Sequence, residues 1–202
     1  MKERYVFYLG DSHTLGSGDP EALGWAGRLT VAAAGRGIPI TGYNLGVGGE
    51  TSADVVARFG DELRPRQPEL DAGDPRVVFS FGANDTTLDG GAPRCNPERS
   101  CGRLTEALDL AARFGLRSFV VGPAAIDDEA QNDRIDRLSD LFGELCAEWQ
   151  VPYVEVSRPL RESTVWRNEL RAGDGSHPGA AGYGELARLV LDAGWLDWLG
   201  PP

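Results

Sequence analysis

Short runs of apolar residues alternate along the chain with longer segments whose apolar positions recur at helical spacing. The apolar runs are only five to eight residues long and show little polar alternation, which is typical of strands buried on both faces of a parallel sheet. They lie at residues 5–9, 38–45, 76–81, 117–121 and 151–156. Because a helical segment follows each run, the pattern predicts an α/β fold with helices on both faces of a five-stranded parallel sheet.

The helical segments are expected at residues 19–34, 51–65, 103–114, 128–149 and 179–192. The first has Asp19 as its cap, Pro20 at the first helical position and Gly35 as its stop. Residues 85–100 and 157–175 show no helical pattern and are predicted to be irregular. Irregular segments of this length in a compact domain are usually functional or mobile.

Length and composition describe a soluble globular protein with one domain over residues 1–202. The formal net charge of −11 would repel a phosphate backbone, so nucleic acid is not expected as a partner. No apolar run approaches the roughly 18 residues of a membrane span. The run at residues 5–9 is too short for the apolar core of a signal peptide, so we predict a cytoplasmic protein.

Two histidines and three cysteines, scattered along the chain, are poor material for a zinc site. We therefore expect neither a metal nor another cofactor. Cys95 and Cys101 are close enough in sequence to pair, and free thiols in a reducing compartment are the alternative. The oligomeric state is left open.

Chemistry-bearing residues cluster where the predicted strands end. The segments that follow strands one, two, three and five are residues 10–16, 44–51, 82–85 and, at a distance, 174–178. Ligands bind beyond the carboxyl ends of the strands in sheets of this kind, so these four segments should converge on one edge.

Together the four segments supply the parts of an acyl-transfer site. Ser12 is the candidate nucleophile, and a serine hydroxyl needs a general base within hydrogen-bond reach. His177 is the candidate base, and Asp174 stands three residues before it, where a turn lets its carboxylate fix the imidazole tautomer. The candidate oxyanion donors are the Ser12 and Gly49 backbone N–H groups and the Asn84 side chain.

Each motif also has a simpler structural explanation. An Asp-Ser pair after a strand is commonly a helix cap, Gly48-Gly49 is commonly a turn, and Asn84 could cap the next segment. His13 adjoins Ser12, but neighbouring side chains on an extended turn diverge, so it is left out of the triad. The conjunction of four motifs in order, each beyond its own strand, favours catalysis.

The same segments resemble the SGNH, or GDSL-like, hydrolase superfamily, named for a serine, a glycine, an asparagine and a histidine in four blocks. The blocks are similar to Gly10-Asp11-Ser12-His13, residues 44–51, Gly82-Ala83-Asn84-Asp85 and Asp174-Gly175-Ser176-His177-Pro178. The resemblance implies a flavodoxin-like three-layer α/β/α sandwich with strand order 2-1-3-4-5, and metal-free ester or thioester hydrolysis. Gly49 matches the glycine of block two, and Gly48 beside it is the alternative source of the oxyanion amide.

The expected function is therefore hydrolysis of a small-molecule carboxylic ester through an acyl-enzyme on Ser12. No large apolar lid is visible, which favours short-chain acyl or acetyl esters, and Leu15, Leu88 and Trp166 are candidate substrate contacts. A thioesterase or an O-acyltransferase on the same site is the alternative. A non-catalytic flavodoxin-like binding module is a further one, although a receiver domain would need a lysine after strand five, and the only lysine is Lys2.

Overall fold

The computed structural model of the chain describes residues 3–66, 70 and 73–201, so Met1 and Lys2 lie outside it. At its centre is a parallel sheet of five strands in the order β2-β1-β3-β6-β7. The strands are β1 (Arg4–Gly10), β2 (Ile40–Gly46), β3 (Asp74–Ser80), β6 (Arg117–Val121) and β7 (Tyr153–Val154). Counted along these five strands the order is 2-1-3-4-5, which confirms the predicted sheet and its topology.

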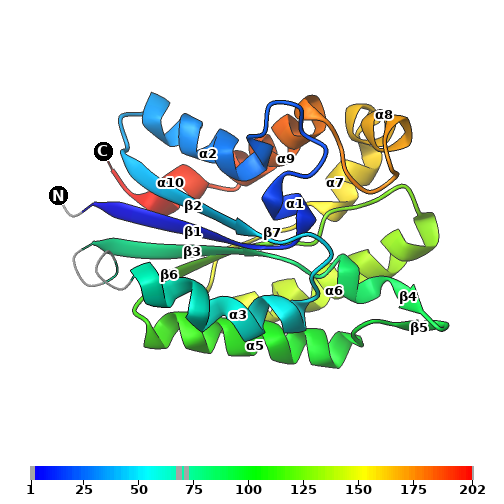
Figure 1. Cartoon of the computed structure of the whole chain (residues 1–202), viewed down its shortest axis with the longest axis horizontal. Coiled ribbons are helices and arrows are strands. Elements are labelled where there is room, and N and C mark those ends of the chain that lie inside the picture. The colour runs from blue at the N-terminus through cyan, green and yellow to red at the C-terminus, as the bar shows by residue number, and fades with distance from the viewer. Residues whose placement is uncertain (1–2, 67–69, 71–72, 202) are drawn as a thin grey trace.

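Helices cover both faces of the sheet and complete the three-layer sandwich (Figure 1). One face carries α2 (Gly24–Gly35), α9 (Ala180–Asp192) and α10 (Trp195–Leu199). The other carries α3 (Ser52–Leu63), α5 (Pro97–Arg113) and α6 (Glu129–Glu148). Shorter pieces lie near the ends of the strands: α1 (Ser12–Leu15), η1 (Arg64–Arg66), η2 (Asn84–Thr86), β4 (Leu88–Asp89), β5 (Ala92–Pro93), α7 (Ser157–Glu162) and α8 (Thr164–Ala172).

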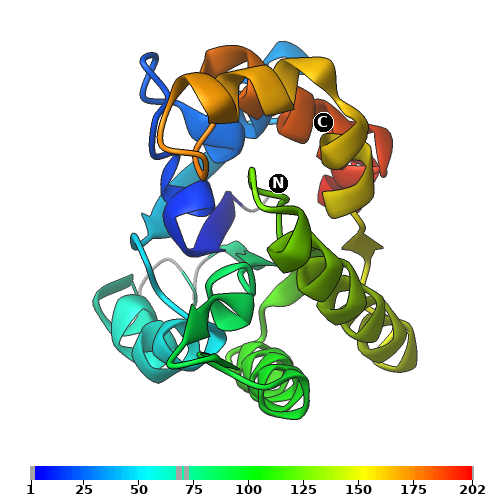
Figure 2. The ribbon, with the colours of Figure 1, turned by 90° about the vertical axis from the view of Figure 1, so that its right-hand side faces the viewer.

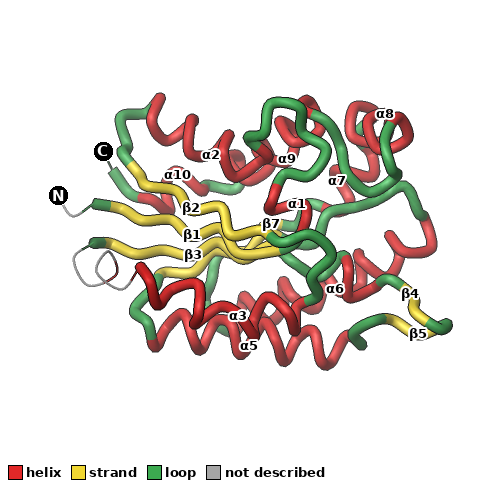
Figure 3. Tube along the Cα trace, viewed as in Figure 1, coloured by secondary structure: helices red, strands yellow, loops and turns green. Residues whose placement is uncertain are grey.

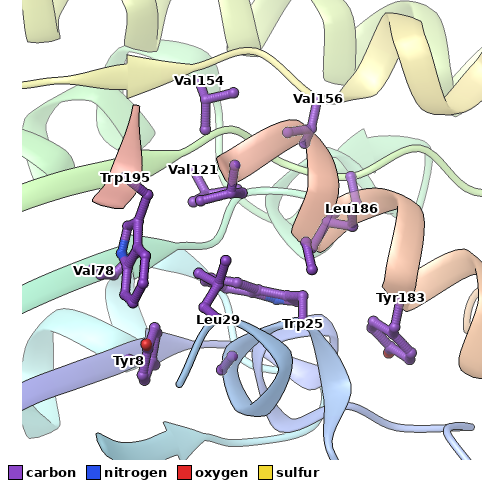
Figure 4. Packing of buried hydrophobic residues seen from close by; sticks show 14 of the residues in the cluster. Tyr8, Trp25, Leu29, Val78, Val121, Val154, Val156, Tyr183, Leu186 and Trp195 are labelled. Carbon is purple, nitrogen blue, oxygen red and sulfur yellow. The ribbon is translucent and has the colours of Figure 1, made fainter. Parts of the chain in front are cut away.

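The central strands are apolar throughout because each face of the sheet packs against a hydrophobic core of its own. In β1, Val6 and Tyr8 belong to the cluster under α2 and α9, whereas Phe7 and Leu9 belong to the cluster under α3, α5 and α6. Figure 4 shows the first cluster, in which the Tyr8 ring meets Trp25 of α2 edge-on at a centroid distance of 5.6 Å. Alternate side chains of one strand therefore fill opposite cores, which explains the missing polar alternation.

Several element boundaries differ from those predicted. Helix α2 begins at Gly24 rather than near Pro20, because Asp19 accepts the N–H groups of Glu21 and Gly24 and pairs with Arg28 from a turn outside the helix. Helix α5 begins at Pro97, with Asn96 as its cap, six residues earlier than expected. Residues 85–100 therefore hold the β4–β5 pair and a helix start, and residues 157–175 hold α7 and α8.

Asp85 ties the end of β3 to two helices. Its side chain is fully buried; Oδ1 accepts the Ser52 N–H at the start of α3 at 2.7 Å, and Oδ2 accepts the Ser100 hydroxyl of α5 at 2.5 Å. The same residue follows Asn84, so this anchor also sets the position of a candidate site residue.

We expect Asp85→Ala to lower the free energy of unfolding by about 3 kcal/mol, because it leaves two buried donors without their charged acceptor. Ser100→Ala removes one of these hydrogen bonds to the buried carboxylate and should cost about 1.5 kcal/mol. Urea unfolding followed by circular dichroism measures both. Equal losses in the two variants would contradict the anchoring role of the carboxylate.

Candidate active site

The four segments singled out in the sequence meet beyond the carboxyl ends of the strands. Loops gather at this end of the sheet, which lies at the right in Figure 3 and faces the viewer in Figure 2. A cavity of about 390 Å³ lies there. Its walls are formed by Ser12, His13, Ser17, Gly48, Gly49, Ala83, Asn84, Thr87, Ile126, Gln131, Ser176 and His177. The fold thus brings Ser12, Gly49, Asn84 and His177 to one cavity.

Ser12 is the first residue of α1, directly after β1. Asp11 caps this short helix, since its carboxylate accepts the His13 N–H at 3.0 Å. Two glycines allow the tight packing around the turn: a Cβ at Gly10 would overlap the Ser80 carbonyl oxygen, and a Cβ at Gly46 would overlap the backbone of Leu15. Burial, with the nearby charge of Asp85, raises the pKa of the capping Asp11 carboxyl to about 7.

His177 and Asp174 form a directly hydrogen-bonded pair. The Nδ1 atom of His177 lies 2.7 Å from Asp174 Oδ2, and Asp174 Oδ1 accepts the N–H groups of Ser176 and His177, both at 2.9 Å. The hydrogen bond from His177 is the main cause that holds the pKa of Asp174 well below its usual range. Asp174 is therefore a carboxylate, which can only accept, so Nδ1 of His177 is the donor of this pair and Nε2 is the ring nitrogen left for proton transfer.

Asn84 and the glycine loop lie against the same cavity. Asn84 Nδ2 donates to the Glu50 carbonyl at 2.9 Å, and its distance of 3.5 Å to Asp11 Oδ2 is long for a hydrogen bond. The second N–H of this amide is thus held only by this long contact, which a ligand in the cavity can replace. Gly48 and Gly49 both line the cavity, and of these two only Gly49 has a positive φ, +78°, which favours glycine.

Arg58 of α3 is a supporting residue that sequence analysis missed. Its guanidinium donates to the carbonyl oxygens of Gly10 at 3.1 Å and Leu45 at 2.7 Å, where β1 and β2 end. It also pairs with the Glu50 carboxylate at 2.7 Å, and the Glu50 carbonyl in turn holds Asn84. Arg58 therefore joins the serine turn to the glycine loop. The sequence pattern shows only an arginine on an amphipathic helix.

His13 is buried beside the catalytic candidates. Its Nε2 atom lies 2.8 Å from the Ser176 carbonyl oxygen, which can only accept, so Nε2 carries the proton. Its ring lies 5.5 Å from that of His177 and stacks on Trp166 at 6.1 Å. Burial, and secondly the nearby His177, lower the pKa of His13 to about 4. His13 is thus a neutral ring that holds the backbone next to His177.

The buried state of His13 predicts a pH-dependent stability. The unfolded chain binds a proton at His13 below about pH 6.5, whereas the folded protein does so only below about pH 4. His13 therefore contributes a loss of about 3 kcal/mol in the free energy of unfolding as the pH drops from 6.5 towards 4. The Asp11 carboxyl, whose pKa is raised to about 7, contributes in the opposite direction over the same range, so the effect of His13 is measured against a variant. His13→Gln keeps a donor for Ser176 and does not titrate, so the wild-type protein should lose stability relative to this variant as the pH falls over this range. Urea unfolding at several pH values between 7 and 4.5 measures the free energy of unfolding of both proteins. A difference between them that does not change with pH would contradict this prediction.

The three predicted substrate contacts lie outside the cavity wall. Trp166 is fully buried and lies behind His13, and Leu15 and Leu88 are each 48% exposed without lining the cavity. Of the two alternatives for the cysteines, the structure shows free thiols: Cys95 and Cys101 are not bonded. Among the residues described, no three histidine, cysteine or acidic side chains are grouped so as to hold a metal ion. Within the same residues, no helix has the length and apolar character needed to cross a bilayer.

Comparison with known proteins gives a consistent result. The profile of the GDSL-like lipase/acylhydrolase family matches residues 8–184. A curated relative, the "uncharacterized lipoprotein YqeF" of Bacillus subtilis (strain 168), is 27% identical over 122 residues. That match spans 57% of this chain and 46% of the relative, so it covers about half the relative's length.

Two solved structures share the fold over almost their whole length. A lipase/acylhydrolase from Enterococcus faecalis superposes with a TM-score of 0.78 at 23% identity, covering 98% of each chain. A catalytic mutant of Axe2, an acetylxylan esterase from Geobacillus stearothermophilus, superposes with a TM-score of 0.75 at 18% identity, covering 99% of this chain and 95% of the other. At these identities the likeness establishes the architecture.

Proposed function

The chain belongs to the GDSL-like lipase/acylhydrolase family, and from this premise we propose that it hydrolyses carboxylic esters through an acyl-enzyme on Ser12. The observation that carries the proposal is the hydrogen-bonded Asp174–His177 pair, whose imidazole lines the same cavity as Ser12 and Asn84. Nucleophile, base, orienting carboxylate and an amide donor are the groups that acyl transfer needs.

The proposed reaction has two steps. The Ser12 hydroxyl attacks the ester carbonyl carbon while His177 Nε2 takes its proton, and the imidazolium that forms is stabilised by Asp174. The carbonyl oxygen becomes an oxyanion that accepts hydrogen bonds from the Ser12 N–H, the Gly49 N–H and Asn84. His177 then gives the proton to the leaving alcohol. Water releases the acyl group from Ser12 by the same route.

The walls of the cavity favour a small acyl group. Among the described residues that line it, Ile126 is the only large aliphatic side chain, and the others are small or polar. A long acyl chain would find little apolar surface to bury there. We therefore propose short-chain or acetyl esters as substrates. Thioester hydrolysis and acyl transfer to another alcohol use the same acyl-enzyme and are the competing activities.

A substrate panel tests the proposal. Initial rates are measured for p-nitrophenyl esters from acetyl to palmitoyl, for acetylated sugars and for an acyl-CoA, with the Ser12→Ala protein as the blank. Highest kcat/KM on the acetyl ester, falling with chain length, would support a short-chain esterase. Faster turnover of the acyl-CoA would favour the thioesterase instead. Rates equal to the blank throughout would overturn ester hydrolysis.

Asn84→Ala should lower kcat by about a hundredfold to a thousandfold, because one donor to the oxyanion is lost. The KM should change much less, since the interaction strengthens only as charge develops on the oxygen. Steady-state kinetics on p-nitrophenyl acetate separate the two constants. A loss confined to KM would show that Asn84 binds the ground state rather than the oxyanion.

A further inference from the structure

One wall of the cavity has no part in the proposed reaction. It contains Gln131, the third residue of α6, and Thr87, which directly follows η2. Gln131 is only 8% exposed, yet it lines the cavity. Buried polar side chains normally have all their hydrogen-bonding groups satisfied, so the partners of this one show what it is built to bind.

The orientation of the Gln131 amide is fixed by its neighbours. One end lies 3.1 Å from the Ala83 carbonyl oxygen and 3.0 Å from Thr87 Oγ1. Because a backbone carbonyl can only accept, this end is the NH₂ group, and both of its protons are used. The opposite end is the carbonyl oxygen Oε1.

That oxygen is left available. Within the described part of the chain, no group donates a hydrogen bond to Oε1. Among the described residues, the side-chain polar atoms that are both fully buried and without a hydrogen-bond partner belong to Trp25, Arg76 and Trp195. Oε1 of Gln131 is not one of them, so it is not fully buried. It is therefore accessible to whatever fills the cavity.

Thr87 supplies the complementary group. Its Oγ1 accepts the Gln131 N–H, so its own proton points away from that bond, and no described residue is recorded as its acceptor. Thr87 is half-buried and lines the same cavity. The pair thus presents one acceptor and one donor side by side. A hydroxyl group, which both donates and accepts, matches this combination.

We propose that Thr87 and Gln131 select esters that carry a free hydroxyl group close to the ester bond, such as esters of a polyol or of a hydroxy acid. The inference rests on the proposed ester hydrolysis and deepens it by naming the substrate class. A substrate without the hydroxyl would displace water from both side chains and leave them unpaired. Rejection of the plain ester, rather than attraction to the hydroxylated one, supplies most of the selectivity.

The test compares kcat/KM on ethyl acetate with that on two hydroxylated esters. Glycerol 1-acetate carries the hydroxyl on the alcohol, and ethyl glycolate carries it on the acyl group. We expect kcat/KM of the wild-type protein to be about tenfold to a hundredfold higher on one of the two than on ethyl acetate. One buried polar group left without a hydrogen bond costs about a factor of ten, and the plain ester leaves one or two such groups. Whichever ester is preferred shows which half of the substrate meets the pair.

Variants locate the preference. Thr87→Val has nearly the same shape without the hydroxyl and should bring the ratio close to one, whereas Thr87→Ser should restore it. Gln131→Met removes Oε1 and should also reduce the ratio. It removes the hydrogen bond to the Ala83 carbonyl as well, but an effect of that loss that is equal for both esters does not change the ratio. Thr105→Val, on the distant helix α5, is the matched control and should leave both rates unchanged.

Three results would overturn the inference. They are a wild-type ratio near one, a Thr87→Val protein that loses both activities in equal proportion, and a ratio that Thr87→Ser does not restore. Each leaves Ser12-dependent hydrolysis of ethyl acetate intact in the wild-type protein, so the proposed function survives. Absence of any Ser12-dependent hydrolysis would instead remove the proposed function on which the inference rests.

Discussion

Ser12→Ala is expected to lower kcat for p-nitrophenyl acetate on the order of a million-fold, the loss seen when a serine nucleophile of this kind is removed. No acyl-enzyme can form without the hydroxyl, and what remains comes from substrate binding and the oxyanion donors alone. The variant should fold normally, because the Ser12 hydroxyl has no hydrogen bond to a described residue and the cap of α1 belongs to Asp11. Initial rates, with circular dichroism to confirm folding, measure the effect.

Ser17 provides the matched control, since it lines the same cavity and uses its backbone carbonyl, not its hydroxyl, to accept from Tyr183 at 2.7 Å. Ser17→Ala should therefore retain most of the activity. A serine-directed phosphonate should add once to the wild-type protein, at Ser12, and not to Ser12→Ala. Near-wild-type hydrolysis by Ser12→Ala, or labelling of another residue, would contradict the assignment of the nucleophile.

The sheet could be predicted because its signal is local and redundant. Val77, Val78 and Phe79 are buried on alternate faces, so any strand in that position must be apolar throughout. The prediction was least accurate for strand β7, since the run predicted at residues 151–156 pairs only over Tyr153–Val154. The residue before it is Pro152, which has no N–H and takes part only through its carbonyl oxygen, which accepts the Val120 N–H at 2.9 Å.

Helices α7 and α8 could not be predicted because tertiary contacts define them. Helix α8 is nine residues long and marginal in isolation. Ser163 caps it, Trp166 and Leu170 fill the core under α9, and Glu169 accepts the Gly182 N–H at 2.7 Å. None of these partners is close in sequence except the cap. The helical spacing of apolar residues in this short segment was therefore not recognised, and the segment was predicted to be irregular.

The candidate site divides in the same way. Ser12 and Asn84 each follow a strand whose end can be located from nearby residues, so their convergence could be expected from the topology. The Asp174–His177 pair follows α8, whose end could not be located, and only the spacing of the two residues indicated it. Gln131 could not be found, because its place in the wall depends on how α6 packs against the segment after β3. The roles that catalysis assigns to these residues stay predictions until the variants are measured.

His177→Ala should be about as damaging as Ser12→Ala, again on the order of a million-fold in kcat, because a neutral serine hydroxyl without a base is a poor nucleophile. The double variant should be no slower than either single one, since residues that act as one unit are not additive. Rates of the three proteins on p-nitrophenyl acetate test this. A double variant much slower than both single variants would show that Ser12 and His177 act independently.

His13 is the rival candidate for the general base, because it is a second imidazole in the wall of the same cavity. Its Nε2–H is held by the Ser176 carbonyl, and a pKa of about 4 makes its Nδ1, which lies 3.8 Å from Asp11 Oδ1, a weak base at neutral pH. It should therefore be unable to replace His177, and adding His13→Gln to His177→Ala should cause no further loss. A His177→Ala protein that keeps a tenth of the wild-type activity, and loses it when His13 is also replaced, would transfer the role of base to His13.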